Sequence, residues 1–294
     1  MKAVPSAYLI AERTATLFTM LALFGSAAFR VGVLRMTAKA TPNTLSEQLS
    51  GVAMQAGWAA GAVLLVLALV RLNGQVVTLF DGWRNASGAD VRALLLHTTW
   101  GYGLLLQFAA AVIVTAGAFI GRPLDAAMMI PLALSMSLMG HAAAAKHFTA
   151  VSIAADTIHA LAAGAWVGGV AYVWLATRIA ADQRELLRIV RAFSPIALTC
   201  AACVAATGTF AALQHIPSMH ALTSSVYGTQ LLVKLSLVTA TLCAGYWNWR
   251  RGTPALDAGR PETIRRGVTL EVFFAIAVSF ATSRLIVLPP PPVY

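Results

Sequence analysis

Long runs of apolar residues alternate with short polar stretches along the whole chain. A helix that crosses a bilayer needs about 20 consecutive, mostly apolar residues. Eight stretches meet this requirement, and each predicts one membrane-spanning helix. They lie near residues 6–29, 51–71, 92–119, 123–142, 152–177, 192–214, 227–249 and 266–288. The pattern therefore predicts an all-α, polytopic membrane protein built as an eight-transmembrane-helix bundle.

The segments between the predicted spans are short, so we expect no soluble domain. The longest of them cover residues 31–50, 72–91 and 250–265. Glu12 and Arg13 interrupt the first apolar run, and no convincing A-x-A cleavage site follows it. This run is therefore predicted to be a retained helix and not a secretory signal peptide.

Composition agrees with a location in the lipid bilayer. Hydrophobic residues make up 59% of the chain, charged residues make up 11%, and the mean hydropathy is +0.74. A soluble domain carries about 25% charged residues. A net charge of +10 would favour a nucleic-acid partner in a soluble protein, but here the charges lie between apolar runs, so we expect no nucleic-acid binding.

The distribution of Lys and Arg predicts the orientation of the bundle. Threading the eight spans through the membrane places thirteen basic residues on one side and five, Arg71 among them, on the side of the N-terminus. Loops rich in Lys and Arg face the cytoplasm. We therefore predict a multi-pass membrane protein with both termini on the outer side.

The same threading places every histidine on the outer side of the membrane. The six are His97, His141, His147, His159, His215 and His220. Imidazole is the commonest metal ligand, and ionisable groups are rare in membrane-embedded helices. The asymmetry therefore indicates a metal-handling site in the outer half of the bundle.

The strongest local pattern is Asp156-x-x-His159, which precedes Trp166-x-Gly168-Gly169. Asp156, His159 and Trp166 share one helix face. A carboxylate one turn from an imidazole can fix its tautomer, as partners of metal-binding histidines do. Small residues in the same segment allow close helix packing. The simpler alternative is that Asp156 and His159 only form hydrogen bonds with neighbouring helices.

His141 follows two methionines, Met136 and Met139, at the end of the fourth predicted span. One short loop joins this span to the next, so His141 and His159 could approach each other. Thioethers combined with imidazoles suit copper better than calcium or magnesium. For the two methionines alone, apolar packing is the more ordinary explanation.

A predicted outer loop contains His215, Met219 and His220 and carries no charge. These side chains could capture copper from outside, although their spacing is not specific and surface histidines are common. His97 and His147 are weaker candidates.

Three cysteines, Cys200, Cys203 and Cys243, lie at comparable depth in the inner halves of two predicted spans. Thiolates are soft ligands that could receive Cu(I). Packing as small apolar residues is the favoured alternative, and a disulfide framework is not expected.

Lys234 lies about two turns inside the seventh predicted span. A lysine within a bilayer needs a carboxylate partner. Asp156 is the predicted partner, and Glu12 is the competing one. The chain shows no arrangement for nucleophilic hydrolysis and no phosphate-binding loop, so we predict neither an enzyme nor an ATP-driven pump.

These motifs, in this order and spacing, resemble the CopD/PcoD copper-resistance membrane proteins. The similar features are Gly140-His141-Ala142, Asp156-x-x-His159, Trp166-x-Gly168-Gly169, Arg191-x-Phe193-Ser194, Thr207-Gly208, Tyr227-Gly228, Lys234 and Asn248. The resemblance implies a CopD-like domain over residues 131–294, preceded by a less specific region over 1–130. It also implies a copper function for His141, Asp156, His159 and Lys234, and a separate periplasmic CopC-like partner.

Two function classes follow. The first is an inner-membrane protein that transports or handles copper ions, taken from the periplasmic face. The alternative is an electron-transfer protein with haem b held between two histidines, because His97, His141 and His159 lie at similar predicted depth. A structural or sensor subunit is a third interpretation, and association into a homo-oligomer stays open.

Overall fold

The computed structural model describes residues 6–38, 44–145, 148–215 and 218–288. Regular structure within these ranges is entirely helical. The first half contains α1 (Ser6–Ala28), η1 (Phe29–Leu34), α2 (Arg35–Ala38), α3 (Thr44–Phe80), α4 (Gly88–Leu96), α5 (Thr99–Phe119) and α6 (Asp125–Met139). The second half contains η2 (His141–Ala144), α7 (Thr149–Ile179), α8 (Gln183–His215), α9 (Met219–Ser224), α10 (Val226–Trp247), η3 (Asn248–Gly252), α11 (Thr253–Asp257) and α12 (Pro261–Val287).

Seven helical stretches in the described part of the chain are long and apolar enough to cross a membrane. They correspond to seven of the eight predicted spans. The remaining one, predicted at 123–142, is α6, which has only 15 residues and contains Pro131. At 1.5 Å per residue α6 is about 22 Å long, less than the ~30 Å hydrocarbon core. The all-helical membrane fold is therefore supported, while the count of eight spans stays a prediction.

Several helices extend further than the apolar pattern predicts. The loops predicted at 31–50 and 72–91 are largely helical, because α3 runs from Thr44 to Phe80. Polar residues continue a helix readily, and hydropathy detects only its apolar part. The predicted span 92–119 is instead two helices, because Thr98 caps α5 by accepting a hydrogen bond from the Gly101 amide at 2.9 Å.

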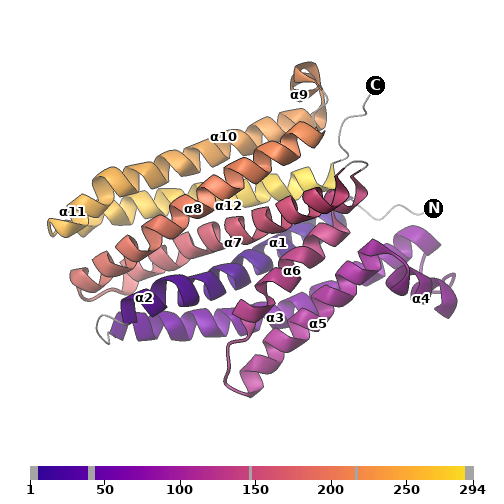
Figure 1. The fold of residues 1–294 in the computed structure, drawn as a ribbon, viewed down its shortest axis with the longest axis horizontal. Helices are drawn as coiled ribbons and strands as arrows, with labels where there is room; N and C mark the ends of the chain where they lie inside the picture. The colour runs from indigo at the N-terminus through magenta and orange to yellow at the C-terminus, as the bar shows by residue number, and fades with distance from the viewer. Residues whose placement is uncertain (1–5, 39–43, 146–147, 216–217, 289–294) are drawn as a thin grey trace.

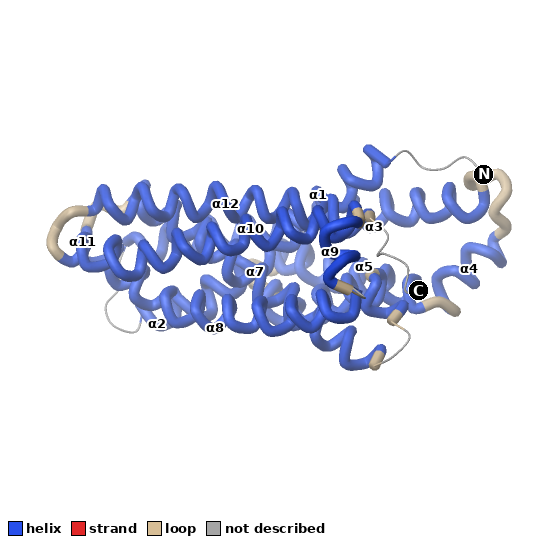
Figure 2. Tube along the Cα trace, turned by 90° about the horizontal axis from the view of Figure 1, so that it is seen from above, coloured by secondary structure: helices blue, strands red, loops and turns tan. Residues whose placement is uncertain are grey.

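The helix α7 lies at the centre of the bundle. It packs against α1, α6, α8 and α12, and α10 packs on α12. Figure 2 shows α10 and α12 on one side of α7 and α8 on the other. The short helices α4 and α9 lie at the end where α1 begins and α12 finishes, and α2 and α11 lie at the opposite end (Figure 1). The end carrying α4 and α9 is called the histidine end below.

Glycines allow α1 and α7 to cross in direct backbone contact. A Cβ atom added at Gly168 would lie 2.4 Å from the Leu21 carbonyl oxygen and 2.5 Å from the Gly25 Cα atom. Gly169 faces the Phe193 ring, where an added Cβ would lie 2.4 Å from its Cε2 atom. Gly168 and Gly169 therefore allow α7 to approach α1 and α8 closely.

We expect Gly168→Ala to destabilise the purified protein by about 1–3 kcal/mol, the usual cost of overpacking. The added methyl group meets backbone atoms of α1, which cannot rotate away. Gly51→Ala is the matched control, because nothing lies within 4 Å of its Cβ position. Thermal unfolding in detergent measures both. Equal melting temperatures for the two variants would contradict the close α1–α7 contact.

Two networks of buried charge cross the N-terminal half of the bundle. The guanidinium of Arg71 contacts Glu12 at 2.5 Å, Thr16 at 3.0 Å and Gln107 at 3.1 Å. Arg71 and Glu12 are each only 6% exposed. Arg71 ended the predicted span 51–71 and was counted among the basic residues on the side of the N-terminus, but α3 continues past it and the side chain is buried inside the bundle. Glu12 also serves as the counter-ion of Arg71 and does not compete for Lys234.

The second network joins α1 and its π-helical continuation to the start of α6. Arg30 forms an ion pair with Asp125, and Ser26 donates a hydrogen bond to the same carboxylate at 3.1 Å. Asp125 is 1% exposed. The ion pair holds α6 against α1. Arg30 therefore contributes to helix packing as well as to the count of basic residues that predicts the orientation.

Candidate functional site

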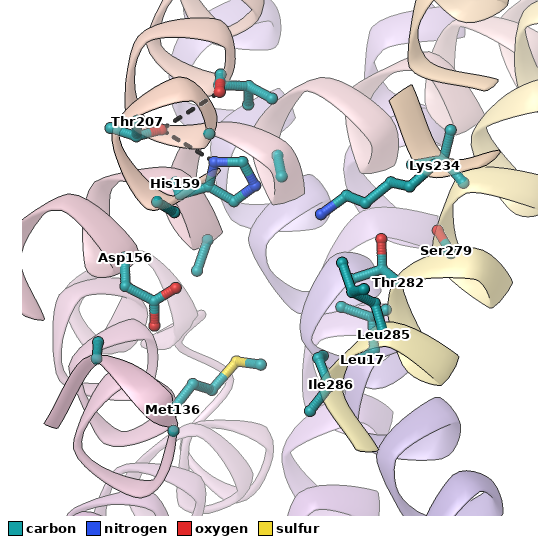
Figure 3. Close-up of a pocket in the computed structure, with 18 of the residues that line it drawn as sticks. Leu17, Met136, Asp156, His159, Thr207, Lys234, Ser279, Thr282, Leu285 and Ile286 are labelled. Carbon is teal, nitrogen blue, oxygen red and sulfur yellow. Dashed lines mark hydrogen bonds between the residues drawn. The ribbon is translucent and has the colours of Figure 1, made fainter. Parts of the chain in front are cut away.

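A cavity of about 310 Å³ lies between α1, α7, α8, α10 and α12 toward the histidine end. Its lining includes two imidazoles, a carboxylate, a thioether, an ammonium group and several hydroxyls. They belong to Met136, His141, Asp156, His159, Thr207, Lys234, Thr241, Ser279 and Thr282. Figure 3 shows Asp156, His159 and Met136 on one side and Lys234 reaching in from the other.

The half-buried ring of His159 is held in one tautomer. Its Nδ1 atom lies 2.9 Å from the Thr207 hydroxyl, which itself donates its only hydrogen to the Cys203 carbonyl at 2.6 Å. The hydroxyl must therefore accept from His159, and Nδ1 carries the proton. The Nε2 lone pair is then available to a ligand.

The other predicted ligands reach the cavity from neighbouring segments. Asp156 lies one helical turn before His159 and is exposed. Met136, near the end of α6, directs its sulfur into the same space (Figure 3). His141, in the short turn after α6, is exposed at the cavity mouth, with Nε2 3.4 Å from the Ile286 carbonyl oxygen. His141 and His159, which were predicted to approach each other, thus line the same cavity.

Lys234 extends from α10 across the cavity toward α7 (Figure 3). Its ammonium group interacts electrostatically with both Asp156 and His159. Lys234 and Asp156 thus line the same cavity, and their direct pairing stays a prediction. Glu12 pairs with Arg71, and Asp156 is the carboxylate among the described residues of the cavity lining.

Several predicted ligands lie outside this cavity. His97 is the exposed C-terminal cap of α4. Met139 is buried against the Arg71 guanidinium, with its sulfur 3.6 Å from Nη1. Met219 and His220 are exposed on α9, which is a short helix where a loop was predicted. His215 ends α8, and the position of its side chain lies outside the described part of the chain, as does His147 entirely.

The positions of the cysteines agree with the favoured packing explanation and not with a three-thiol copper site. Cys200 packs against the apolar core shared by α7 and α8, whereas Cys243 is exposed on α10. The helices α8 and α10 pack on different partners, so depth along the bundle does not bring their thiols together. The packing explanation fits Cys200 better than a metal site.

Trp166 belongs to the cavity although its indole is 6% exposed. It lies at the inner end of the cavity, two turns beyond His159, and it also interacts with Glu271 of α12. Sequence reasoning missed Glu271 as a functional candidate. The signal was present, because Glu271 is a lone carboxylate within an apolar span.

The described residues contain no cluster of three or more His, Cys, Asp or Glu side chains arranged to hold a metal ion. The cavity instead offers one imidazole lone pair, a nearby carboxylate, a thioether and a second imidazole at the mouth. The fold and cavity define a polytopic helical membrane protein with a polar site inside its bundle.

Comparisons with known proteins agree with a polytopic helical membrane protein and show which family part of the chain resembles. Residues 187–285 match the family model of CopD, copper resistance protein D. Copper transport protein CutJ of Bacillus subtilis (strain 168) is 32% identical over 164 residues, which are 55% of this chain and 29% of that protein. The chain thus spans less than a third of this curated relative. No solved structure matches.

The predicted resemblance to the CopD family is therefore confirmed. The matched segment forms the helices α8 to α12 and carries Thr207, Lys234 and Ser279 of the cavity wall. Asp156 and His159 precede the segment, but the hydrogen bond between His159 and Thr207 ties them to it. The segment that matches the CopD model thus forms part of the cavity wall.

Proposed function

We propose that this protein transports copper across the membrane, or hands it on there, through the cavity between α7, α8, α10 and α12. The observation that carries the proposal is the His159 Nε2 lone pair, fixed by Thr207 beside Asp156 and Met136. Imidazole and thioether are ligands that copper accepts well. The copper-related family match supports the same cargo.

Copper enters at the histidine end, which is the periplasmic face in this proposal. His141 at the cavity mouth makes the first contact, and His159 with Met136 holds the ion further inside. The exposed Met219 and His220 of α9 lie at the same end and form a capture surface in this proposal. A periplasmic CopC-like protein is the proposed donor.

The remaining parts of the proposal concern the membrane. The excess of basic residues at the end opposite the histidines supports an inner-membrane protein with periplasmic termini. Residues 131–294 form the CopD-like unit in this proposal, and residues 1–130 support it through α1 and α3. The protein acts as a transporter rather than an enzyme.

The proposal is tested by titrating purified protein in detergent with Cu(I) under a competing chelator. We expect one ion per chain for the wild type and about 10–100-fold weaker binding for Asp156→Asn, because this variant removes the carboxylate that lines the cavity beside His159, and loss of a group near the ligands of a metal usually weakens binding by such a factor. Asp182→Asn is the control, because Asp182 lies outside the cavity near the start of α8. Absence of stoichiometric binding by the wild type would refute the proposal.

The same sample separates copper from haem. The comparisons give no support to the haem b alternative, and His97 does not line the cavity with His141 and His159. We expect an absorption spectrum without a Soret band. A Soret band lost on His141→Ala would instead establish ligation by two histidines.

A further inference from the structure

A second polar group lies immediately beyond the inner end of the cavity. Glu271 of α12 and Asn248 at the end of α10 are each 6% exposed, and Asn248 Nδ2 donates to Glu271 Oε2 at 2.8 Å. Trp166 lines the cavity and also interacts with the Glu271 carboxyl. The proposed copper function uses neither Glu271 nor Asn248.

The surroundings of Glu271 contain no balancing charge. Among the described residues, no Lys, Arg or His approaches its carboxyl within ion-pair distance. The arginines of the packed helices are used elsewhere: Arg178 contacts Thr269, and Arg265 contacts Glu262 and the Thr177 carbonyl. Arg250 and Arg251 of η3 are exposed. A bare carboxylate in this position is strongly disfavoured within a bilayer.

The pair packs closely against a glycine of α12 and a glycine of α10. A Cβ atom at Gly267 would lie 1.8 Å from Asn248 Oδ1, and one at Gly245 would lie 3.2 Å from Glu271 Oε1. Hard cations require about six oxygen ligands around them. A proton requires no such space.

Two further features mark this position as more than packing. Asn248 Oδ1 is buried without a hydrogen-bond partner, which is rare for a polar atom in a folded core. Asn248 also begins η3, a π-helical turn within an otherwise continuous helix. Such turns are rare and occur frequently at functional sites.

We infer that Glu271 is a proton-binding site that exchanges its proton when a cation enters the cavity. The carboxyl is neutral in the metal-free protein, with its proton on oxygen. A cation held in the cavity, on the other side of Trp166, stabilises the carboxylate, so the O–H bond breaks and the proton leaves to solvent while Asn248 Nδ2 donates to the anion. Linkage requires the reverse effect as well, so that protonation of Glu271 weakens cation binding.

The protonation state can be tested without any metal. Infrared difference spectra of the purified full chain between acidic and alkaline pH should show the carbonyl stretch of a protonated acid that is missing in Glu271→Gln. Glu262→Gln on the exposed face of α12 should keep it. Asn248→Ala should shift its frequency, which provides a second variant should Glu271→Gln fail to fold. A band unchanged in both Glu271→Gln and Asn248→Ala would overturn the assignment.

The exchange itself rests on the proposed copper function and is tested separately. Cu(I) added to lightly buffered wild-type protein should release up to about one proton per ion more than it does from Glu271→Gln, because metal binding and proton loss are linked. Equal proton release at equal copper binding would overturn the exchange and leave the copper function standing. A wild type that binds no copper would instead refute the copper function, and the infrared result would still decide the protonation of Glu271.

Discussion

Arg71→Met prevents the protein from accumulating in folded form, and this is the largest effect on stability that we expect. The substitution leaves the buried Glu12 carboxylate with Thr16 at 3.0 Å and the partly exposed Arg13 at 3.4 Å. Breaking a buried ion pair by removing one partner costs about 3–5 kcal/mol. Proteins have only about 5–15 kcal/mol of stability in total.

Fluorescence-detected size-exclusion chromatography of membrane extracts measures the folded yield. Arg191→Met is the matched control, because its pair with Asp257 is exposed and such pairs contribute about 0–1 kcal/mol. The double variant Glu12→Gln with Arg71→Met should recover part of the yield, since it removes the isolated charge. Equal yields for Arg71→Met and Arg191→Met would show that the Arg71 network does not hold α1 and α3 together.

His159→Ala removes the function without disturbing the fold. The substitution deletes the Nε2 lone pair that faces the cavity, and the Thr207 hydroxyl keeps its hydrogen bond to the Cys203 carbonyl. No buried donor is therefore left unpaired. We expect cells that express His159→Ala to accumulate no more copper than cells without the protein.

His97→Ala is the control for this experiment, because His97 is an exposed helix cap outside the cavity. Cellular copper is measured by mass spectrometry after growth in defined copper, with membrane levels of each variant matched by immunoblot. Similar losses in His97→Ala and His159→Ala would point to a general effect of histidines at that end. Wild-type accumulation in His159→Ala would exclude the cavity as the copper route.

The apolar pattern predicted the fold well because the hydrophobic requirement of a bilayer acts on every residue of a span. It failed at the ends of helices, where polar and apolar residues continue a helix equally well. The additional length of α3 is one example, because Arg71 was the last residue of a predicted span and instead lies buried within a longer helix. The break between α4 and α5 could have been predicted at Thr98, since threonine is a favoured residue at the N-terminal cap of a helix.

The candidate site was predicted in part. Asp156 and His159 were found because they lie one turn apart on one helix, which the sequence shows directly. Met136 and Lys234 converge with them on the cavity. Helical depth alone was insufficient for Cys243 and His97, because depth does not determine which way a side chain faces.

Charge pairs between distant segments were not predictable from one sequence. Asp125 binds Arg30 across 95 positions, and Arg71 binds Glu12 across 59 positions. Each pairing depends on how the helices pack and rotate. The lone carboxylate of Glu271 was visible in its apolar span, but its interaction with Trp166 depends on how α12 packs against α7.

X-ray absorption of the purified protein loaded with one equivalent of Cu(I) tests most directly whether copper binds in the cavity through His159. We expect scattering from imidazole nitrogen and from a thioether sulfur, with the nitrogen contribution reduced in His159→Ala and the sulfur contribution lost in Met136→Leu. A copper environment identical in the wild type and both variants would contradict it.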